Sequence, residues 1–136
     1  MLDINRIRSN IQQHYKDKDE AYVKSRQEEN RKHYAKYYHS KQWQTLRNNY
    51  YVAHPLCECC LLDNIVTQGE EVHHLHVWSK GITEEAKWNL LLNYQNLATL
   101  CPSCHKAAHE LLRKTNKNYV TLDEIRTYKH ELNSYE

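Results

Sequence analysis

Two Cys-x-x-Cys motifs constrain this chain more than any other feature of its sequence. The first occupies residues 57–60 and the second residues 101–104, with residues 61–100 between them. Two thiolates three residues apart can bind one ion from a single turn, and two such turns complete the tetrahedral set that Zn²⁺ prefers. The sequence therefore predicts a structural zinc site whose four ligands are Cys57, Cys60, Cys101 and Cys104.

Other interpretations of the cysteines explain less. A redox motif of the thioredoxin kind would need a surrounding βαβ pattern, and it would not account for two copies. Cys59 is the fifth cysteine. It could replace Cys57 or Cys60 as a ligand, but Cys-x-Cys and Cys-Cys ligand pairs are less common, so we expect Cys59 to be spare.

The composition explains why a zinc site would matter. The chain has 136 residues, of which only 40% are hydrophobic, so we expect one domain with a small core and an added arm. A structural zinc site can contribute on the order of 10 kcal/mol to folding. No apolar run approaches the roughly 20 residues that span a bilayer, and the start of the chain lacks the apolar segment of a signal peptide. We expect a cytoplasmic protein, without membrane contact, whose cysteines are reduced.

The charge is unevenly distributed. Residues 1–50 hold 11 Lys+Arg against 6 Asp+Glu, whereas residues 51–136 hold 8 against 11. Neither glycine nor proline occurs before Pro55, so residues 1–53 are predicted to form a helical basic arm with a break near Ser40. Such an arm is either a nucleic-acid contact surface or an ordinary solvated face.

Residues 54–136 are predicted to form a compact α+β domain. Residues 70–78 favour a strand that enters a hairpin, and residues 96–100 favour the returning strand. A helix is expected over residues 103–115. A last helix is expected to begin at Thr121, where Glu124 can complete a capping box, and to end near Leu132.

The histidines form a second group of possible ligands. His105 and His109 are four residues apart, the spacing that aligns two imidazoles on one helix face for a divalent metal. The pair is not the motif of a zinc protease, because Lys106 stands where that chemistry needs a glutamate. Because His105 directly follows Cys104, the zinc site would fix the first turn of the helix that carries both imidazoles.

His73 and His74 are neighbours in the first expected strand. Adjacent strand residues point to opposite faces, so the two imidazoles are not expected to chelate one ion together. One of them can complete a three-histidine site with His105 and His109, and the other can remain metal-free as a base. We expect no such role for the other histidines, which are His14, His33, His39, His54, His76 and His130.

Glu71-Val72-His73-His74-Leu75, then the run from Asn96 to His105, and then His109 resemble the motif of HNH endonucleases, the ββα-metal nuclease family. The resemblance covers about residues 57–110. The lead-in at residues 38–47 and 55–60 looks like that of small phage- or prophage-type members. The resemblance implies an α+β ββα-metal (HNH, or His-Me finger) domain that acts as a metal-dependent DNA endonuclease of low sequence specificity.

The resemblance also implies roles for single residues. By similarity to colicin-type HNH nucleases, His73, His105 and His109 would hold the catalytic divalent metal, and His74 would be the general base. Asn96 would tie the hairpin loop together, and Glu71 would orient a ligand imidazole. Phosphate contacts by Arg47 and Lys106 are suggested by charge alone.

Two departures from the family pattern affect these roles. The stretch between His74 and Asn96 is longer than a minimal hairpin loop, so Asn89 or Asn93 could be the structural asparagine. The spacing of nine residues to His105 favours Asn96. The first ligand is His73 where many phage relatives have aspartate, which shifts the expected metal from strict Mg²⁺ toward Zn²⁺, Ni²⁺ or Mn²⁺.

Two other classes of function remain open on the sequence alone. A non-catalytic zinc-ribbon module could bind nucleic acid or dock on phage packaging (terminase) components, but it leaves the histidine pattern as coincidence. A structural interaction protein could use the tyrosine-rich arm as its interface, since the chain has 11 Tyr and 3 Trp. The expected partner is DNA, with packaging components as a further expectation.

Overall fold

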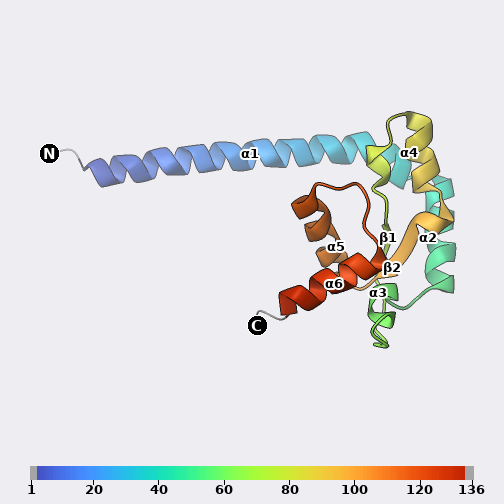
Figure 1. Cartoon of the computed structure of the whole chain (residues 1–136). Coiled ribbons are helices and arrows are strands. Elements are labelled where there is room, and N and C mark those ends of the chain that lie inside the picture. The colour runs from blue at the N-terminus through green and yellow to red at the C-terminus, as the bar shows by residue number, and fades with distance from the viewer. Residues whose placement is uncertain (1–2, 134–136) are drawn as a thin grey trace. The chain divides into compact units, whose positions relative to one another are not determined.

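The computed structural model describes residues 3–133, except for the side chains of residue 11 and residues 14–19 (Figure 1). The chain divides into two compact units, Met1–Tyr38 and His39–Glu136. No helix among the described residues is both long enough and apolar enough to cross a membrane.

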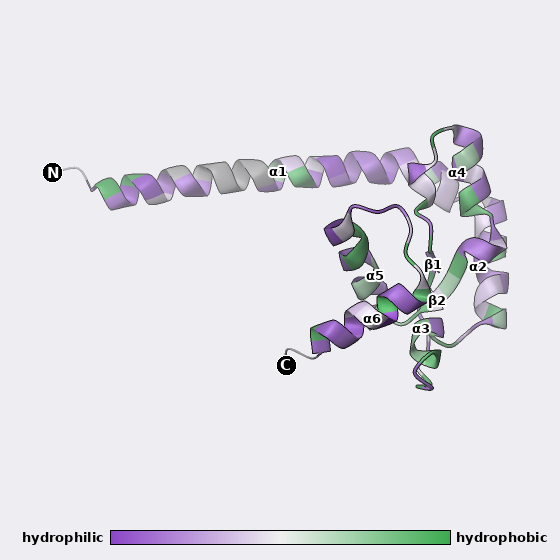
Figure 2. Cartoon of the chain, in the orientation of Figure 1, coloured by the Kyte–Doolittle hydropathy of each residue, from purple (hydrophilic) through white to green (hydrophobic). Residues whose placement is uncertain are grey.

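The first unit is one helix, α1 (Ile4–Tyr38), of 35 residues. It begins where the Asp3 carboxylate accepts a hydrogen bond from the Arg6 backbone N–H, 3.2 Å away, which satisfies one of the free donors of the first turn. Figure 2 shows hydrophilic residues along most of its described length. Ile4 and Ile7 are exposed, whereas the side chain of Ile11, expected on the same face, lies outside the described residues. The described surface of this helix is therefore mostly polar, with a few exposed hydrophobic side chains such as Ile4, Ile7 and Val23.

The second unit begins with α2 (Lys41–Ala53), earlier than the expected domain boundary after residue 53. Ser40 breaks the helical region as expected, because its hydroxyl accepts a hydrogen bond from the Trp43 backbone N–H. Two aromatic residues of α2, Trp43 and Tyr50, are buried. The burial of these two aromatic rings places α2 with the compact unit, although the composition of the helix resembles that of α1.

A two-stranded antiparallel sheet lies at the centre of the second unit (Figure 1). It pairs β1 (Glu71–His74) with β2 (Leu97–Leu100), so that His73 faces Ala98 and His74 faces Leu97. Both expected strands exist, but the first is shorter than residues 70–78 because the chain leaves the sheet after His74. The tight approach to the sheet at Gly69 requires a glycine, since a Cβ there would lie 2.2 Å from the Thr99 methyl carbon.

The connection between the strands is folded rather than a plain loop. It contains η1 (Trp78–Lys80), α4 (Glu84–Leu91) and η2 (Tyr94–Asn96), none of which was expected from the sequence. The Thr83 hydroxyl accepts a hydrogen bond from the Ala86 backbone N–H and so caps α4. These elements bring Leu91 and Asn96 back to the end of β1.

Three further helices complete the unit: α3 (Glu58–Leu61), α5 (Pro102–Thr115) and α6 (Leu122–Asn133). Of these, α3 and α5 contact the sheet, and α6 packs against α3 and α5. The α5 and α6 bounds agree closely with the expected helices. Thr121 and Glu124 form the predicted capping box, because each side chain accepts a hydrogen bond from the other's backbone N–H. Figure 2 shows hydrophobic residues on β2 and on parts of these helices. The main core cluster comprises Cys57, Cys59, Leu100, Cys101, Cys104, Ala107, Ala108, Leu112, Val120, Ile125 and Tyr128.

Tyr50 joins α2 to the sheet through polar contacts. Its buried hydroxyl lies 2.7 Å from a Glu58 carboxylate oxygen and 2.9 Å from the Leu97 carbonyl oxygen. The same Glu58 oxygen accepts a hydrogen bond of 2.6 Å from the Thr99 backbone N–H. Burial and the Glu58 carboxylate raise the pKa of Tyr50, so the hydroxyl keeps its proton and remains a donor.

We predict that Tyr50→Phe lowers the free energy of unfolding by about 1–2 kcal/mol, because it leaves two partly buried acceptors without this donor. Urea denaturation followed by circular dichroism would measure the change. Tyr119→Phe is the matched control, since Tyr119 is 48% exposed. Equal stability of the two variants would contradict the prediction.

Candidate functional site

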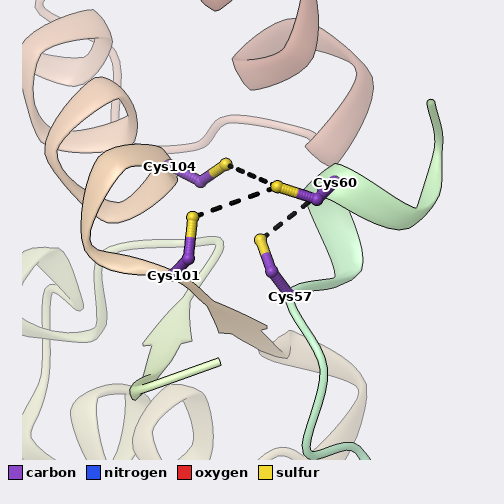
Figure 3. A group of neighbouring side chains, drawn as sticks. All are labelled: Cys57, Cys60, Cys101 and Cys104. Atoms are coloured by element: carbon purple, nitrogen blue, oxygen red, sulfur yellow. Dashed lines mark hydrogen bonds between the residues drawn. The ribbon is translucent and has the colours of Figure 1, made fainter. Parts of the chain in front are cut away.

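The four predicted zinc ligands come together in the second unit. Cys57, Cys60, Cys101 and Cys104 offer sulfur atoms that all lie within 4.8 Å of one another. Figure 3 shows the four thiols converging from two chain segments. The Sγ of Cys60 is 4.0 Å from that of Cys101 and 3.7 Å from that of Cys104.

These distances fit a tetrahedral zinc site. Ligand sulfurs at about 2.3 Å from Zn²⁺ are separated by roughly 3.8 Å from one another. The hydrogen bond with Cys104, together with burial, raises the pKa of the Cys57 thiol to about 12, so without a cation this thiol holds its proton. A bound Zn²⁺ would displace that proton and be enclosed by the four sulfurs.

Cys59 lies beside this cluster, and a side-chain hydrogen bond with Cys104 lowers the pKa of its thiol, against the opposing effect of burial. Its thiol contacts the Leu122 carbonyl oxygen at 3.8 Å, and the residue belongs to the core. The group of mutually close ligand sulfurs does not include it.

A second group of possible metal ligands consists of His73, His105 and His109, whose ring nitrogens also lie within 4.8 Å of one another. His73 comes from β1, and the other two come from one face of α5. The Nε2 atoms of His105 and His109 are 2.9 Å apart, and both rings lie 5.3 Å from the His73 ring, between centroids. His73 is buried, whereas His109 is exposed, so the group is open to solvent on one side.

The chemistry of this group fits a divalent cation. The Nε2 atom of His73 is buried and has no hydrogen-bond partner, which is costly unless it binds something. Burial lowers the pKa of His73 to about 3, with smaller contributions from His109 and His105. Burial also lowers the pKa of His105 and of His109. At neutral pH all three imidazoles are therefore uncharged, the state in which a ring nitrogen can bind a metal.

His74 points to the other side of β1. Its Nε2 lies 3.0 Å from the Leu91 carbonyl oxygen, and its ring packs on Trp43 with a centroid distance of 4.6 Å. Because a carbonyl only accepts, Nε2 must carry the proton, and Nδ1 of the neutral ring is free to accept one. Burial lowers the pKa of His74 to about 4, so the ring is neutral near pH 7.

Asn96 holds the folded connection against the end of β1. Its side-chain oxygen accepts a hydrogen bond of 2.7 Å from the His76 backbone N–H, and its amide donates to the carbonyl oxygens of His76 and Leu90. Asn96 is buried. Of the two alternatives, Asn89 is exposed and Asn93 accepts a local hydrogen bond from the Gln95 backbone N–H. Of these three asparagines, only Asn96 connects His76, which follows β1, with Leu90 in α4.

The remaining candidate residues lie at the surface. Glu71 is exposed, and its charge acts on His105 by raising its pKa, against the larger effect of burial. Arg47 is exposed and shares a surface recess with Glu71, while its guanidinium donates to Gln44. Lys106 is exposed on α5 beside His105.

Sequence reasoning missed several supporting residues. Nothing in the sequence marks Trp43 as more than a packing residue, yet its ring packs on His74. Glu58 and the Leu91 carbonyl carried no signal, since their partners are distant in the sequence.

Comparisons with known proteins agree with this geometry. Residues 57–111 match the family model described as HNH endonuclease. The crystal structure of the HNH endonuclease of the deep-sea thermophilic bacteriophage GVE2, with manganese ion, aligns with a TM-score of 0.52 and 24% sequence identity. The alignment covers 69% of this chain and 98% of that chain. A search of the curated proteins finds no match. The shared architecture confirms the expected fold.

Asn96→Ala is predicted to loosen the connection between the strands, because it removes three hydrogen bonds. Hydrogen exchange at the His76 amide should accelerate, and the free energy of unfolding should fall by about 2–4 kcal/mol. Asn89→Ala, at an exposed position of the same connection, should leave both unchanged. Unaltered exchange at the His76 amide in Asn96→Ala would exclude this bridging role.

A second prediction concerns protonation. In protein whose histidine group is free of metal, His73 and His74 should stay neutral from pH 7.5 to 5.5, because their pKa values are about 3 and about 4. Imidazole ¹⁵N shifts would report this. The unfolded chain protonates near pH 6.5, so the folded state should lose stability as pH falls below that value. A change in these shifts across the interval would contradict the burial of both rings.

Proposed function

We propose that this chain, which carries an HNH endonuclease domain at residues 57–111, is a metal-dependent DNA endonuclease that uses His74 as general base and one catalytic divalent metal. The observation that carries the proposal is the placement of a neutral, oriented His74 on the opposite face of β1 from a three-histidine ligand group. Hydrolysis of a phosphodiester needs an activated water and compensation of charge on the phosphate and the leaving oxygen.

His74 suits the role of base. The hydrogen bond to the Leu91 carbonyl fixes the ring and places the proton on Nε2, so Nδ1 can accept a proton from water. Trp43 packs on the ring and restricts its rotation. The low pKa keeps the base unprotonated near neutral pH, although it also limits its strength.

His73, His105 and His109 would hold the catalytic ion, which when bound would supply positive charge to the phosphate and leaving oxygen. Three protein ligands leave further coordination positions for water or phosphate. The exposed His109 marks the side from which substrate could reach the ion. Imidazole ligands favour Zn²⁺, Ni²⁺ or Mn²⁺ over Mg²⁺.

Two residues would support these groups. Asn96 keeps residues 75–96 folded against β1, and so keeps the Leu91 carbonyl in place for His74. Glu71 lies close enough to act electrostatically on His105, which supports its proposed role beside a ligand imidazole.

Arg47 and Lys106 are proposed phosphate contacts. Both are exposed, Lys106 beside a ligand histidine and Arg47 in the recess that includes Glu71. Phosphate contacts position DNA without reading its sequence, which supports low sequence specificity. The expected terminase partner stays a prediction.

Cleavage of supercoiled plasmid tests the proposal. The wild type, stripped of loosely held metal and supplied with Mg²⁺, Mn²⁺, Ni²⁺ or Zn²⁺ in turn, should nick or linearise the plasmid with at least one ion. His74→Ala should reduce the rate by about 10²–10⁴-fold, the usual contribution of a general base. His39→Ala is the matched control, because His39 is exposed and lies outside both ligand groups.

We propose that Cys57, Cys60, Cys101 and Cys104 hold a structural zinc ion. The His74→Ala result is interpretable only if the variant keeps its fold and this zinc, which circular dichroism and metal analysis would establish. Cleavage by His74→Ala at the wild-type rate would refute the assignment of the base. If the wild type binds DNA but cuts it with none of these ions, the non-catalytic zinc-ribbon module becomes the better interpretation.

A further inference from the structure

The C-terminal helix α6 reaches the four-cysteine cluster through a charged side chain. Lys129 places its Nζ 3.1 Å from the Sγ of Cys104 and donates a hydrogen bond to it. Lys129 is half-buried and lies outside residues 57–111, which match the HNH family model. Neither the Cys-x-x-Cys spacing nor the family match therefore points to it.

Polar contacts with Asp63 hold this part of α6 near the first cysteine motif. Asp63, which follows α3, accepts a hydrogen bond of 2.8 Å from Nε of Arg126, and its other oxygen lies 2.7 Å from Nε2 of His130. Arg126 and His130 are the residues three before and one after Lys129 on α6. The Cys59 thiol also contacts the Leu122 carbonyl oxygen, near the start of α6. Lys129 is thus positioned by contacts on both sides of it in the sequence.

The negative charge of a zinc-bound four-cysteine site explains what Lys129 would do there. Four thiolates around one Zn²⁺ carry a net charge of −2, and burying such charge is costly unless nearby donors or cations compensate it. A charged N–H donor within hydrogen-bond distance of a thiolate supplies both a hydrogen bond and a positive charge. Groups that hydrogen-bond to metal ligands commonly change metal affinity by about 10–100-fold when they are removed.

We infer that Lys129 is a positioning residue of the four-cysteine site, which compensates the charge on Cys104 and slows the loss of its zinc. The inference rests on the proposed occupancy of this site by zinc. It makes α6 part of the metal site, although α6 supplies no ligand.

Zinc release from the full chain tests the inference. Lys129→Met keeps the length of the side chain without its charge, Lys129→Gln is a neutral donor, and Lys129→Arg keeps both the charge and the donor. Lys117→Met is the matched control, because Lys117 is exposed between α5 and α6. After metal analysis of each protein, transfer of zinc to a chromogenic chelator would be followed in time. Release should be about 10–100-fold faster from Lys129→Met and intermediate from Lys129→Gln, whereas Lys129→Arg and Lys117→Met should resemble the wild type.

Replacement of zinc by Co²⁺ separates a direct effect on the thiolate from a general loss of stability. Removing the N–H donor raises the energy of the sulfur electrons, so the thiolate-to-cobalt charge-transfer band of Lys129→Met should move to lower energy. A merely looser fold would leave the band in place. Equal zinc release from Lys129→Met and the wild type, or an unmoved band, would overturn the inference while leaving the zinc site intact. A wild type without tightly bound zinc would instead overturn the zinc site itself and, with it, the role of Lys129.

Discussion

The convergence of the two cysteine pairs is the constraint on which the second unit depends. It brings residues 57–60 and 101–104 together, and the chain between them contains both strands of the sheet. Cys101 follows β2 directly, and Cys104 lies in the first turn of α5. Because His105 and His109 stand on the same helix, the cluster also fixes the direction in which their imidazoles point. With a chain that is only 40% hydrophobic, a metal in this cluster would supply order that a small core supplies poorly.

The alternation of side chains along β1 produces two different environments from adjacent histidines. His73 faces α5 and has a buried nitrogen without a partner, whereas His74 faces Trp43 and the Leu91 carbonyl. Burial lowers the pKa of both rings and so keeps each of them neutral, but the two neutral rings suit different functions. A ligand needs a free lone pair toward a cation, and a base needs one toward water. The strand thereby separates the two roles that we propose for these histidines.

The sequence predicted those features that depend on local spacing. The two cysteine motifs, the His105 and His109 pair, and the capping box at Thr121 all follow from helix and turn geometry within a few residues. The features it did not predict depend on contacts between distant segments. The burial of Trp43 depends on His74, and the contacts of Glu58 depend on Tyr50 in α2 and on Thr99 in β2. The helix α4 was missed because its short, mixed sequence folds only against the rest of the unit.

The two ligand groups, which both draw residues from α5, differ in a way that fits the different uses that we propose for them. The four cysteines form a closed set, buried or half-buried, with every sulfur directed inward, so an ion held there would have no position left for water. The three histidines form an incomplete set with an exposed member, so an ion held there would keep positions for other ligands. Since Cys104 and His105 are consecutive, the closed site can hold the open one in shape while taking no part in its chemistry. Rigid support next to an open coordination position is what a metal-dependent hydrolase requires.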